Sequence, residues 1–128
     1  FSPEKRKQVD RLRSRIMIGD TASTFVQASA SAPPKRVVQA LHQAFITQTE
    51  LEIRYQREDG ETSDRQIAPH YLLLKYPIWY VVAIDHLRGG PRIFRCDRML
   101  TARKTETSFR LSSKEAFEPS IAKDDLSL

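Results

Sequence analysis

Arginines that could bind an anion are concentrated in one part of the sequence. Residues 92–110 contain six Lys or Arg residues against two Asp or Glu residues. Within this stretch, Arg95 and Arg98 lie three positions apart. A guanidinium group binds phosphate through two parallel hydrogen bonds, and the ring of a tyrosine such as Tyr80 can stack on a nucleic-acid base. These residue types indicate a site for a phosphorylated, base-bearing molecule.

Six residues make up the candidate ligand-binding site, and four of them have a structural alternative. Tyr80 half-buried in a strand, Arg95 and Arg98 in salt bridges and His70 with internal hydrogen-bond partners would explain the same residue types without a ligand. For Arg95 and Arg98, the possible carboxylate partners are Asp97, Asp85 and Glu52. The six candidates are Tyr80, Arg95, Arg98, His70, Arg65 and Arg92.

The periodicity of a strand decides which candidates can share a surface. On a flat strand, Arg95 and Arg98 would project from opposite faces, because their spacing is odd. We hypothesise that a bulge or bend near Asp97 brings both arginines to one pocket. In the preceding apolar stretch, the same alternation places Tyr80 and Trp79 on opposite faces, and we expect Trp79 in the core.

Patterns of catalytic and metal-binding residues are missing from the sequence. Cys96 is the single cysteine, and it does not combine with the three histidines at zinc-finger spacing. The chain also lacks the Gly-x-Ser-x-Gly, His-Glu-x-x-His and phosphate-loop motifs. We therefore expect a non-enzymatic protein without a cofactor or metal, in which Cys96 is buried and unreactive. A hydrolytic enzyme such as a nuclease is the least favoured alternative.

Length, composition and charge favour one basic, globular domain. The 128 residues include 40% hydrophobic and 29% charged residues, as in ordinary globular proteins. No apolar run approaches the roughly 20 residues of a membrane-spanning helix, and the N-terminus does not resemble a secretory signal. We expect a cytoplasmic location and no membrane partner. The net charge of +5 indicates an anionic partner, although a solvated basic surface would give the same value.

Two helices are predicted in the first half of the chain. Ser2 is the expected N-cap of the first helix, Pro3 its first residue and Gly19 its stop. The thin apolar stripe of this helix suits a connecting or partner-facing role. Residues 21–34 are small and polar, as in a linker. The double proline that closes them opens a second helix, which runs to about Thr49 and should pack on a sheet.

Five short antiparallel strands are predicted in the second half. Alternation of apolar and polar residues predicts strands over 51–56, 63–74, 78–85 and 92–104, with a short last strand at 109–111. A bent sheet of this size can curl into a barrel, because closure removes exposed edges. The expected fold class is α+β, mainly β: a small Sm-like (SH3-like) five-stranded β-barrel preceded by two helices. An OB-like barrel is the alternative.

Three blocks of the sequence resemble the WYL domain. They are Ile67-Ala68-Pro69-His70-Tyr71-Leu72, Trp79-Tyr80-Val81 and Arg92-Ile93-Phe94-Arg95-Cys96-Asp97-Arg98-Met99. The resemblance covers about residues 36–111. The family is named for a Trp-Tyr-Leu triplet, and Val81 stands here in place of the leucine, which is a conservative apolar change.

The resemblance implies the ligand-sensing domain of a bacterial transcriptional regulator. Such regulators usually bind DNA through an N-terminal winged helix-turn-helix, and a C-terminal extension often helps them to dimerise. The implied divisions are a linker helix after a missing DNA-binding domain (1–20), a linker (21–34), the WYL domain (35–111) and the start of a C-terminal extension (112–128). The implied effector is a nucleic acid or a nucleotide. The full-length protein would be a homodimer associated with the nucleoid.

Two functional hypotheses remain open at this point. In the first, the effector shifts an equilibrium between arrangements of the linker helices, and it changes DNA affinity only if it prefers one arrangement. In the second, the domain is a dimerisation or interaction module without a small ligand. The apolar stripe of the first helix, Val9, Leu12 and Ile16, would then set the oligomeric state.

Overall fold

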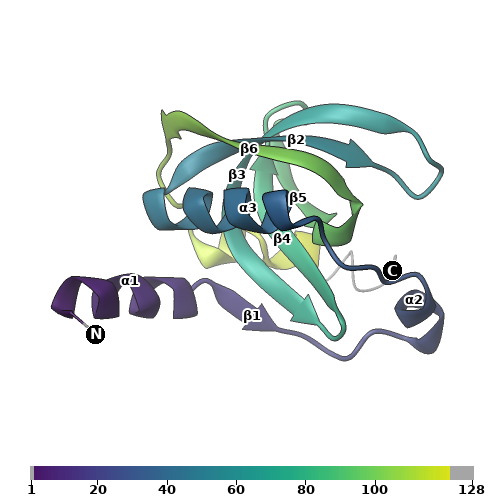
Figure 1. Ribbon diagram of the computed structural model, residues 1–128, viewed down its shortest axis with the longest axis horizontal. Helices are drawn as coiled ribbons and strands as arrows, with labels where there is room; N and C mark the ends of the chain where they lie inside the picture. The colour runs from purple at the N-terminus through teal and green to yellow at the C-terminus, as the bar shows by residue number, and fades with distance from the viewer. Residues whose placement is uncertain (1, 122–128) are drawn as a thin grey trace.

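The computed structural model describes residues 2–121 and combines helices with one mixed sheet (Figure 1). The helices are α1 (Pro3–Arg13), α2 (Thr24–Ala28) and α3 (Lys35–Thr47). The strands are β1 (Ile16–Ile18), β2 (Thr49–Gln56), β3 (Thr62–Lys75), β4 (Ile78–Asp85), β5 (Gly90–Arg95) and β6 (Met99–Ser108). Two 3-10 turns are η1 (Cys96–Arg98) and η2 (Lys114–Ala116). Among the described helices, none is long and apolar enough to cross a membrane.

The start of α1 agrees with the sequence prediction, and its end does not. The Ser2 hydroxyl accepts a hydrogen bond from the Lys5 amide at 3.1 Å, as expected of an N-cap. The helix ends at Arg13, well before Gly19, because the chain becomes extended and forms β1. The predicted linker also contains the short helix α2, which Ser23 caps through a hydrogen bond from the Val26 amide.

The sheet is open, so the expected closed barrel is not formed. The strand order is β5-β4-β3-β2-β6, and β1 pairs with β3 in parallel. The edge strands β5 and β6 do not pair with each other in the described residues. The strand predicted over 92–104 is two strands, because η1 interrupts it and carries the chain from one edge of the sheet to the other. The short strand predicted at 109–111 is not observed.

The long strand β3 changes its neighbour halfway along. Residues 62–67 pair with β2, whereas residues 72–74 pair with β1. Between these two stretches, the register with β4 shifts between Pro69 and Tyr71, so that His70 is an extra residue in a bulge. The bulge also reverses which side chains of β3 point to each face of the sheet.

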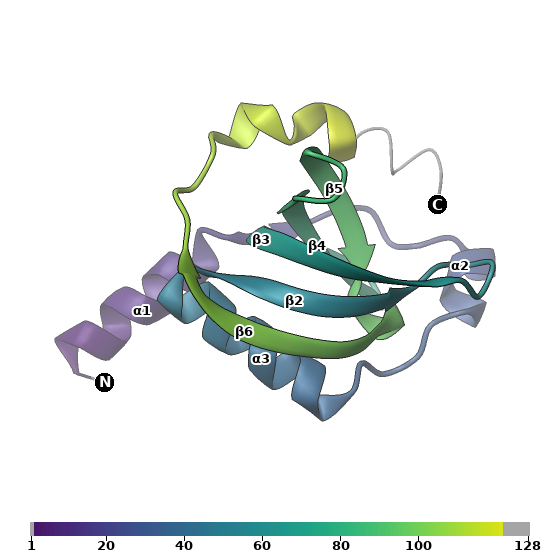
Figure 2. The ribbon, with the colours of Figure 1, turned by 90° about the horizontal axis from the view of Figure 1, so that it is seen from above.

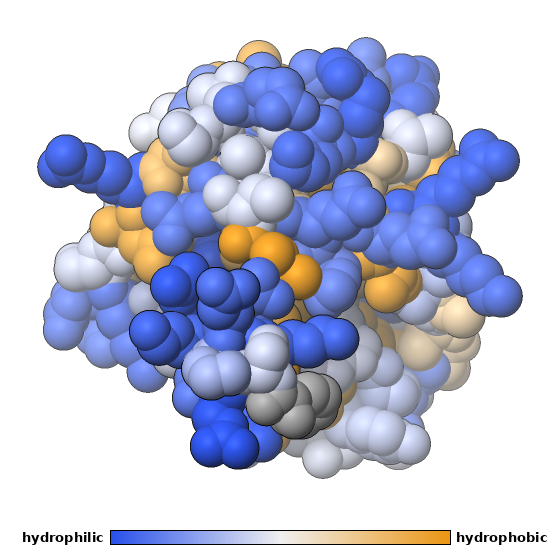
Figure 3. Space-filling model, turned by 60° about the vertical axis from the view of Figure 1, so that its left-hand side comes forward, coloured by the Kyte–Doolittle hydropathy of each residue, from blue (hydrophilic) through white to orange (hydrophobic). Residues whose placement is uncertain are grey.

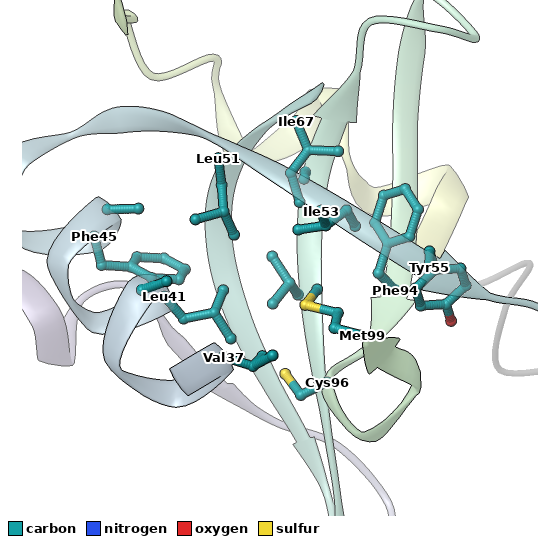
Figure 4. Packing of buried hydrophobic residues seen from close by; sticks show 14 residues of the cluster. Val37, Leu41, Phe45, Leu51, Ile53, Tyr55, Ile67, Phe94, Cys96 and Met99 are labelled. Carbon is teal, nitrogen blue, oxygen red and sulfur yellow. The ribbon is translucent and has the colours of Figure 1, made fainter. Parts of the chain in front are cut away.

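The face of the sheet beneath α3 holds the larger core. Figure 4 shows Val37, Leu41 and Phe45 of α3 pointing at the strands, where they meet Leu51 and Ile53 of β2. Their spacing of four residues places them on one stripe of the helix. The same cluster includes Val81, Ala83, Phe94, Cys96 and Met99.

The opposite face is covered by α2 and by the C-terminal segment, which passes over the sheet on the side away from α3 (Figure 2). Tyr80 and Val82 are buried there with Phe117. The predicted alternation along β4 is therefore confirmed, since Val81 points to the other face. The prediction for Trp79 was wrong: it lies near the start of β4 and is 38% exposed.

Candidate anion-binding site

Tyr80 and Arg95 are neighbours across two strands. They are direct partners in the antiparallel register of β4 and β5, so their side chains lie on the same face of the sheet. Tyr80 is only 1% exposed. Burial raises the pKa of its phenol, although the charges of Arg95 and Arg98 act in the opposite direction. The ring is therefore part of the core in this arrangement.

Arg95 is held in a buried ion pair with Asp97. The guanidinium Nε and Nη2 donate to the two carboxylate oxygens at 2.9 and 2.7 Å, and Nη1 donates to the Ser29 hydroxyl at 3.0 Å. The hydrogen bond to Asp97 raises the pKa of Arg95. For Asp97, burial alone would raise the pKa, but hydrogen bonds from Arg95 and the Ser31 amide outweigh it and lower the pKa.

The predicted bend near Asp97 exists and places Arg98 beside the same groups. Arg98 is the last residue of η1 and is partly exposed. The positive charge of Arg98 acts to lower the pKa of Tyr80, of Asp97 and of Tyr55, as the charge of Arg95 does. For the two tyrosines, the effect of burial is larger, and the net shift is upward. Among residues 2–121, the Arg98 guanidinium has no hydrogen bond or ion pair. Tyr80 and Arg95 thus lie side by side, and Arg98 is close enough for its charge to act on Tyr80 and Asp97.

Tyr55 completes this cluster and was missed by the sequence analysis. Its hydroxyl accepts a hydrogen bond from the Arg95 amide at 3.0 Å. Its ring packs edge-on against Phe94, with centroids 5.0 Å apart and planes at 83°. Burial raises the pKa of this phenol. Periodicity places Tyr55 on the inner face of a strand, but no local pattern predicts a partner forty residues away.

Arg65 and Arg92 lie elsewhere, on either side of Asp85. The Asp85 side chain is completely buried and accepts a hydrogen bond from Nη1 of Arg65 at 2.5 Å. Nη1 of Arg92 lies 4.0 Å from the same carboxylate oxygen. Asp85 shares the face of Val81 and Ala83, which is opposite to that of Tyr80. The salt bridge to Asp85 that was considered from sequence for Arg95 and Arg98 is therefore made by Arg65 instead.

His70 is hydrogen-bonded on both ring nitrogens within the fold. Nε2 accepts from the Ser112 amide at 3.0 Å, so Nδ1 carries the proton and donates to the Ala68 carbonyl at 2.8 Å. The ring packs against Phe109 and Phe117. Burial lowers the pKa of His70, and the charge of Arg15 lowers it further. These contacts tie the C-terminal segment to the bulge of β3.

Two further observations concern possible metal ligands and the single cysteine. Within residues 2–121, no three His, Cys, Asp or Glu side chains are close enough to hold a metal ion. Burial raises the pKa of the Cys96 thiol to about 12, so the thiol is protonated and a poor nucleophile at neutral pH.

The view in Figure 3 shows a mainly hydrophilic surface with small separate apolar patches.

An open sheet packed under one long helix, with Arg95 and Arg98 at the turn between its edge strands, defines a small mixed α/β domain. The sequence model of the WYL domain matches residues 36–104, more than half of the chain, and the chain belongs to that family. No curated protein sequence matches the chain.

One solved structure with a similar fold is proteasome accessory factor B/C (PafBC) of Arthrobacter aurescens. The TM-score is 0.50 and the sequence identity 24%. The similar region covers 77% of this chain and 14% of that chain, so this chain spans only a small part of that protein's length. At this identity the similarity concerns the fold.

Proposed function

We propose that this WYL domain is the ligand-sensing part of a bacterial transcriptional regulator, and that its effector is a nucleic acid or a nucleotide bound at Arg95 and Arg98. The observation that carries the proposal is the Arg95–Asp97 pair. Both donor directions of the Arg95 fork are occupied by a carboxylate of the same chain, in the two-point geometry by which guanidinium also holds phosphate. Arg98 stands beside this pair.

The proposed binding step exchanges the partner of Arg95. A phosphate would first be attracted by Arg98, and would then replace the carboxylate of Asp97 on the Arg95 fork. A terminal phosphate monoester carries about −1.5 to −2 charges against one on the carboxylate, so it would compete with Asp97 for the Arg95 fork. The base of the effector would stack on Tyr80, whose ring is 1% exposed and would have to be uncovered when the ion pair opens.

Exchange of the Arg95 partner would change contacts outside the site, because the Arg95–Asp97 pair is hydrogen-bonded to the loop before α3. Arg95 donates to the Ser29 hydroxyl and carbonyl, and Asp97 accepts from the Ser31 amide. Opening of the pair releases these contacts, so that the segment joining α2 to α3 can move. A ligand that prefers the open form would shift this equilibrium.

The proposed set of ligand contacts is narrower than the six residues expected from sequence. It contains Tyr80, Arg95 and Arg98. Arg65 pairs with the buried Asp85, and Arg92 lies near it, whereas both ring nitrogens of His70 are engaged. We propose binding rather than catalysis as the role of the domain, with no cofactor.

The remaining features of the proposal follow from the family. The domain would relay its state to an N-terminal winged helix-turn-helix of a longer homodimeric protein in the cytoplasm, at the nucleoid. Residues 1–20 and 21–34 would be the connecting segments, 35–111 the sensing domain, and 112–128 the start of an extension. Residues 122–128 of that last segment lie outside the described residues.

The test is binding of a short, fluorescein-labelled oligonucleotide with a 5′-phosphate, followed by anisotropy. Arg98→Ala should weaken binding about 10- to 150-fold, because one charge-assisted hydrogen bond contributes about 1.5–3 kcal/mol. Asp97→Asn should tighten binding, because it removes the competing charge from Arg95. Raising the salt concentration should weaken binding in proportion to the phosphates contacted.

Arg103→Ala is the matched control. Arg103 lies on β6, pairs with Glu52 on the exposed side of the sheet, and loses the same charge on substitution. It should bind as the wild type does. Equal affinity of wild type, Arg98→Ala and Asp97→Asn would contradict the proposed site, and no saturable binding to any of them would contradict the proposed effector class.

A second candidate function is protein interaction through α1. This helix has no buried residue and extends away from the rest of the molecule (Figure 1). An isolated helix of 11 residues is marginal in water, so a packing partner would stabilise it. Light scattering of Val9→Lys would test this function: a change from dimer to monomer supports it, and an unchanged mass contradicts it.

A further inference from the structure

An apolar pocket lies on the α3 side of the sheet, and its wall includes Cys96. Tyr80 and Arg95 lie on the opposite face of the sheet. The volume of the pocket is about 400 Å³, within the range of cavities that bind small molecules. Four segments contribute to its wall: the end of α1, β1, α3 and the sheet. The side chains that matter most are Leu12, Ile16, Val38, Phe45, Leu72 and Trp79.

The pocket exposes apolar surface that the fold leaves uncovered. Trp79 is 38% exposed, Ile16 is 40% exposed and Val38 is 50% exposed, and all three line it. Each would be stabilised by transfer from water to an apolar neighbour, at about 25 cal/mol per Å². Their grouping around one cavity distinguishes them from isolated apolar residues on a surface, which need no explanation.

The residues that line the pocket determine which class of molecule it can bind. Among the described residues that line it, His42, Trp79 and Cys96 carry polar groups, but the wall that they present is almost wholly apolar, and the Cys96 thiol is neutral. An extended peptide would bring backbone groups that need hydrogen-bond partners, and this lining supplies too few of them. A multiply charged molecule such as a nucleotide would lose its hydration without compensation. An alkyl or aryl body fits these walls.

The positive charge at the start of α3 favours a ligand whose alkyl or aryl body carries an anionic or hydroxyl end. No carboxylate lines the cavity, and the wall includes residues on both sides of the first turn of α3. That turn contains Lys35 and Arg36, has no acidic residue, and starts at an N-cap without a side-chain hydrogen bond. The partial positive charge of a helix start adds to these two cations. His42 lies one turn beyond Val38 on the same helix and lines the cavity too.

We propose that this pocket binds a small amphipathic molecule, with an alkyl or aryl body between α1, α3 and Trp79 and one anionic or hydroxyl end at the solvent-facing rim beside the exposed His42. This site goes beyond the proposed function, because it shares no residue with the Arg95–Arg98 site. A bound molecule would join α1 to the sheet through Leu12 and Ile16. It would therefore fix the direction in which α1 leaves the domain.

Trp79 gives a direct readout, because it is the only tryptophan in the chain. Its fluorescence should shift to the blue and saturate on titration with decanoate, at concentrations below micelle formation. Decanol should give the same shift, because the proposal allows a hydroxyl as well as an anionic end. Decylamine should bind at least about tenfold more weakly, a difference of about 1.4 kcal/mol. Binding of decylamine as tight as that of decanoate would contradict the assignment of the polar end.

Two substitutions separate this pocket from general surface adsorption. Val38→Glu places a charge in the wall at a half-exposed helix position, where folding tolerates it, and should abolish the shift. Leu87→Glu makes the same kind of change at an exposed apolar residue in the β4–β5 turn, outside the pocket, and should leave the shift intact.

A saturable shift retained in Val38→Glu would overturn the proposal, and so would the absence of a shift in the wild type. A synthetic acidic amphipathic helix is the competing occupant. If the helix shifts Trp79 fluorescence and decanoate does not, the pocket is a protein-docking surface and the small-molecule assignment is wrong. The oligonucleotide assay is unaffected by any of these outcomes, because the two sites have no residue in common.

Discussion

The guanidinium of Arg15 lies over the ring of Phe45, 4.6 Å from its centroid, and Nη1 also donates to the Phe45 carbonyl at 3.2 Å. The same side chain donates to the carbonyls of His70 at 2.8 Å and of Pro69 at 2.6 Å. Pro69 and His70 lie where β3 has left β2 and has not yet met β1. Arg15 thus supplies hydrogen bonds that a neighbouring strand would otherwise provide.

Arg15→Met should lower the free energy of unfolding by roughly 2–4 kcal/mol, because buried carbonyls would lose their donors. The measurement is urea denaturation followed by circular dichroism. Arg13→Met removes the same charge from an exposed position two residues earlier and should change stability by less than about 0.5 kcal/mol. Equal effects of the two substitutions would mean that the carbonyl contacts contribute nothing.

The lowered pKa of His70 predicts that the folded protein loses stability as the pH falls. Because burial lowers its pKa in the folded protein, the unfolded chain takes up a proton at higher pH than the folded one does. The contribution of neutral His70 is complete above an unfolded pKa of about 6.5 and is lost as the pH falls below it. His70→Gln cannot titrate, so its stability should fall less than that of the wild type between pH 7.5 and 5.5.

The control for this titration is His42→Gln, at an exposed histidine of α3. Its stability should follow that of the wild type across the same pH range. The comparison uses the difference between denaturation midpoints at the two pH values. A pH dependence of His70→Gln identical to that of the wild type would show that His70 is not the titrating group.

Tyr55→Phe removes only the hydroxyl group of the tyrosine that lies beside Arg95. It leaves the Arg95 amide without its acceptor, and we expect a loss of about 1–2 kcal/mol in the free energy of unfolding. Tyr76→Phe is the control, because that tyrosine is exposed, and it should be neutral. A neutral effect of Tyr55→Phe would mean that another group accepts the hydrogen bond.

Cys96 should be almost unreactive towards a disulfide reagent such as Ellman's reagent at pH 8, because its thiol is buried and has a pKa of about 12. In denaturing urea, the one thiol of the chain should react at the rate of a cysteine in a short peptide. The measured quantity is the ratio of these two rates. A ratio near one would show that Cys96 is accessible in the folded protein.

Local patterns were sufficient to predict much of the fold. The start of α1 at Ser2, the helix after the double proline, and the opposite faces of Tyr80 and Val81 were all predicted correctly. These features depend on caps and on periodicities of 3.6 and 2, which neighbouring residues determine. The strand β1 has only three residues and pairs in parallel, so it lacks a recognisable period.

The candidate site was predicted less completely, because its geometry depends on distant contacts. The turn η1 divides the predicted strand where Arg95 and Asp97 pair with each other and with Ser29 and Ser31, which lie in a segment more than sixty residues earlier. Sequence indicated that Arg95 could be either a ligand contact or a salt-bridge partner. The observed pair shows the second role, and the proposed exchange with phosphate would allow the first.

The pairing of β1 with β3 has a consequence for handling this protein. Residues 16–18 cover the strand edge at Leu72–Leu74, where three apolar residues follow one another. Proteolysis after Gly19 would remove that cover together with the Arg15 side chain. The bare edge would then offer unpaired amides and carbonyls to any neighbouring molecule, and self-association into β-rich aggregates is the expected fate of such a truncated chain.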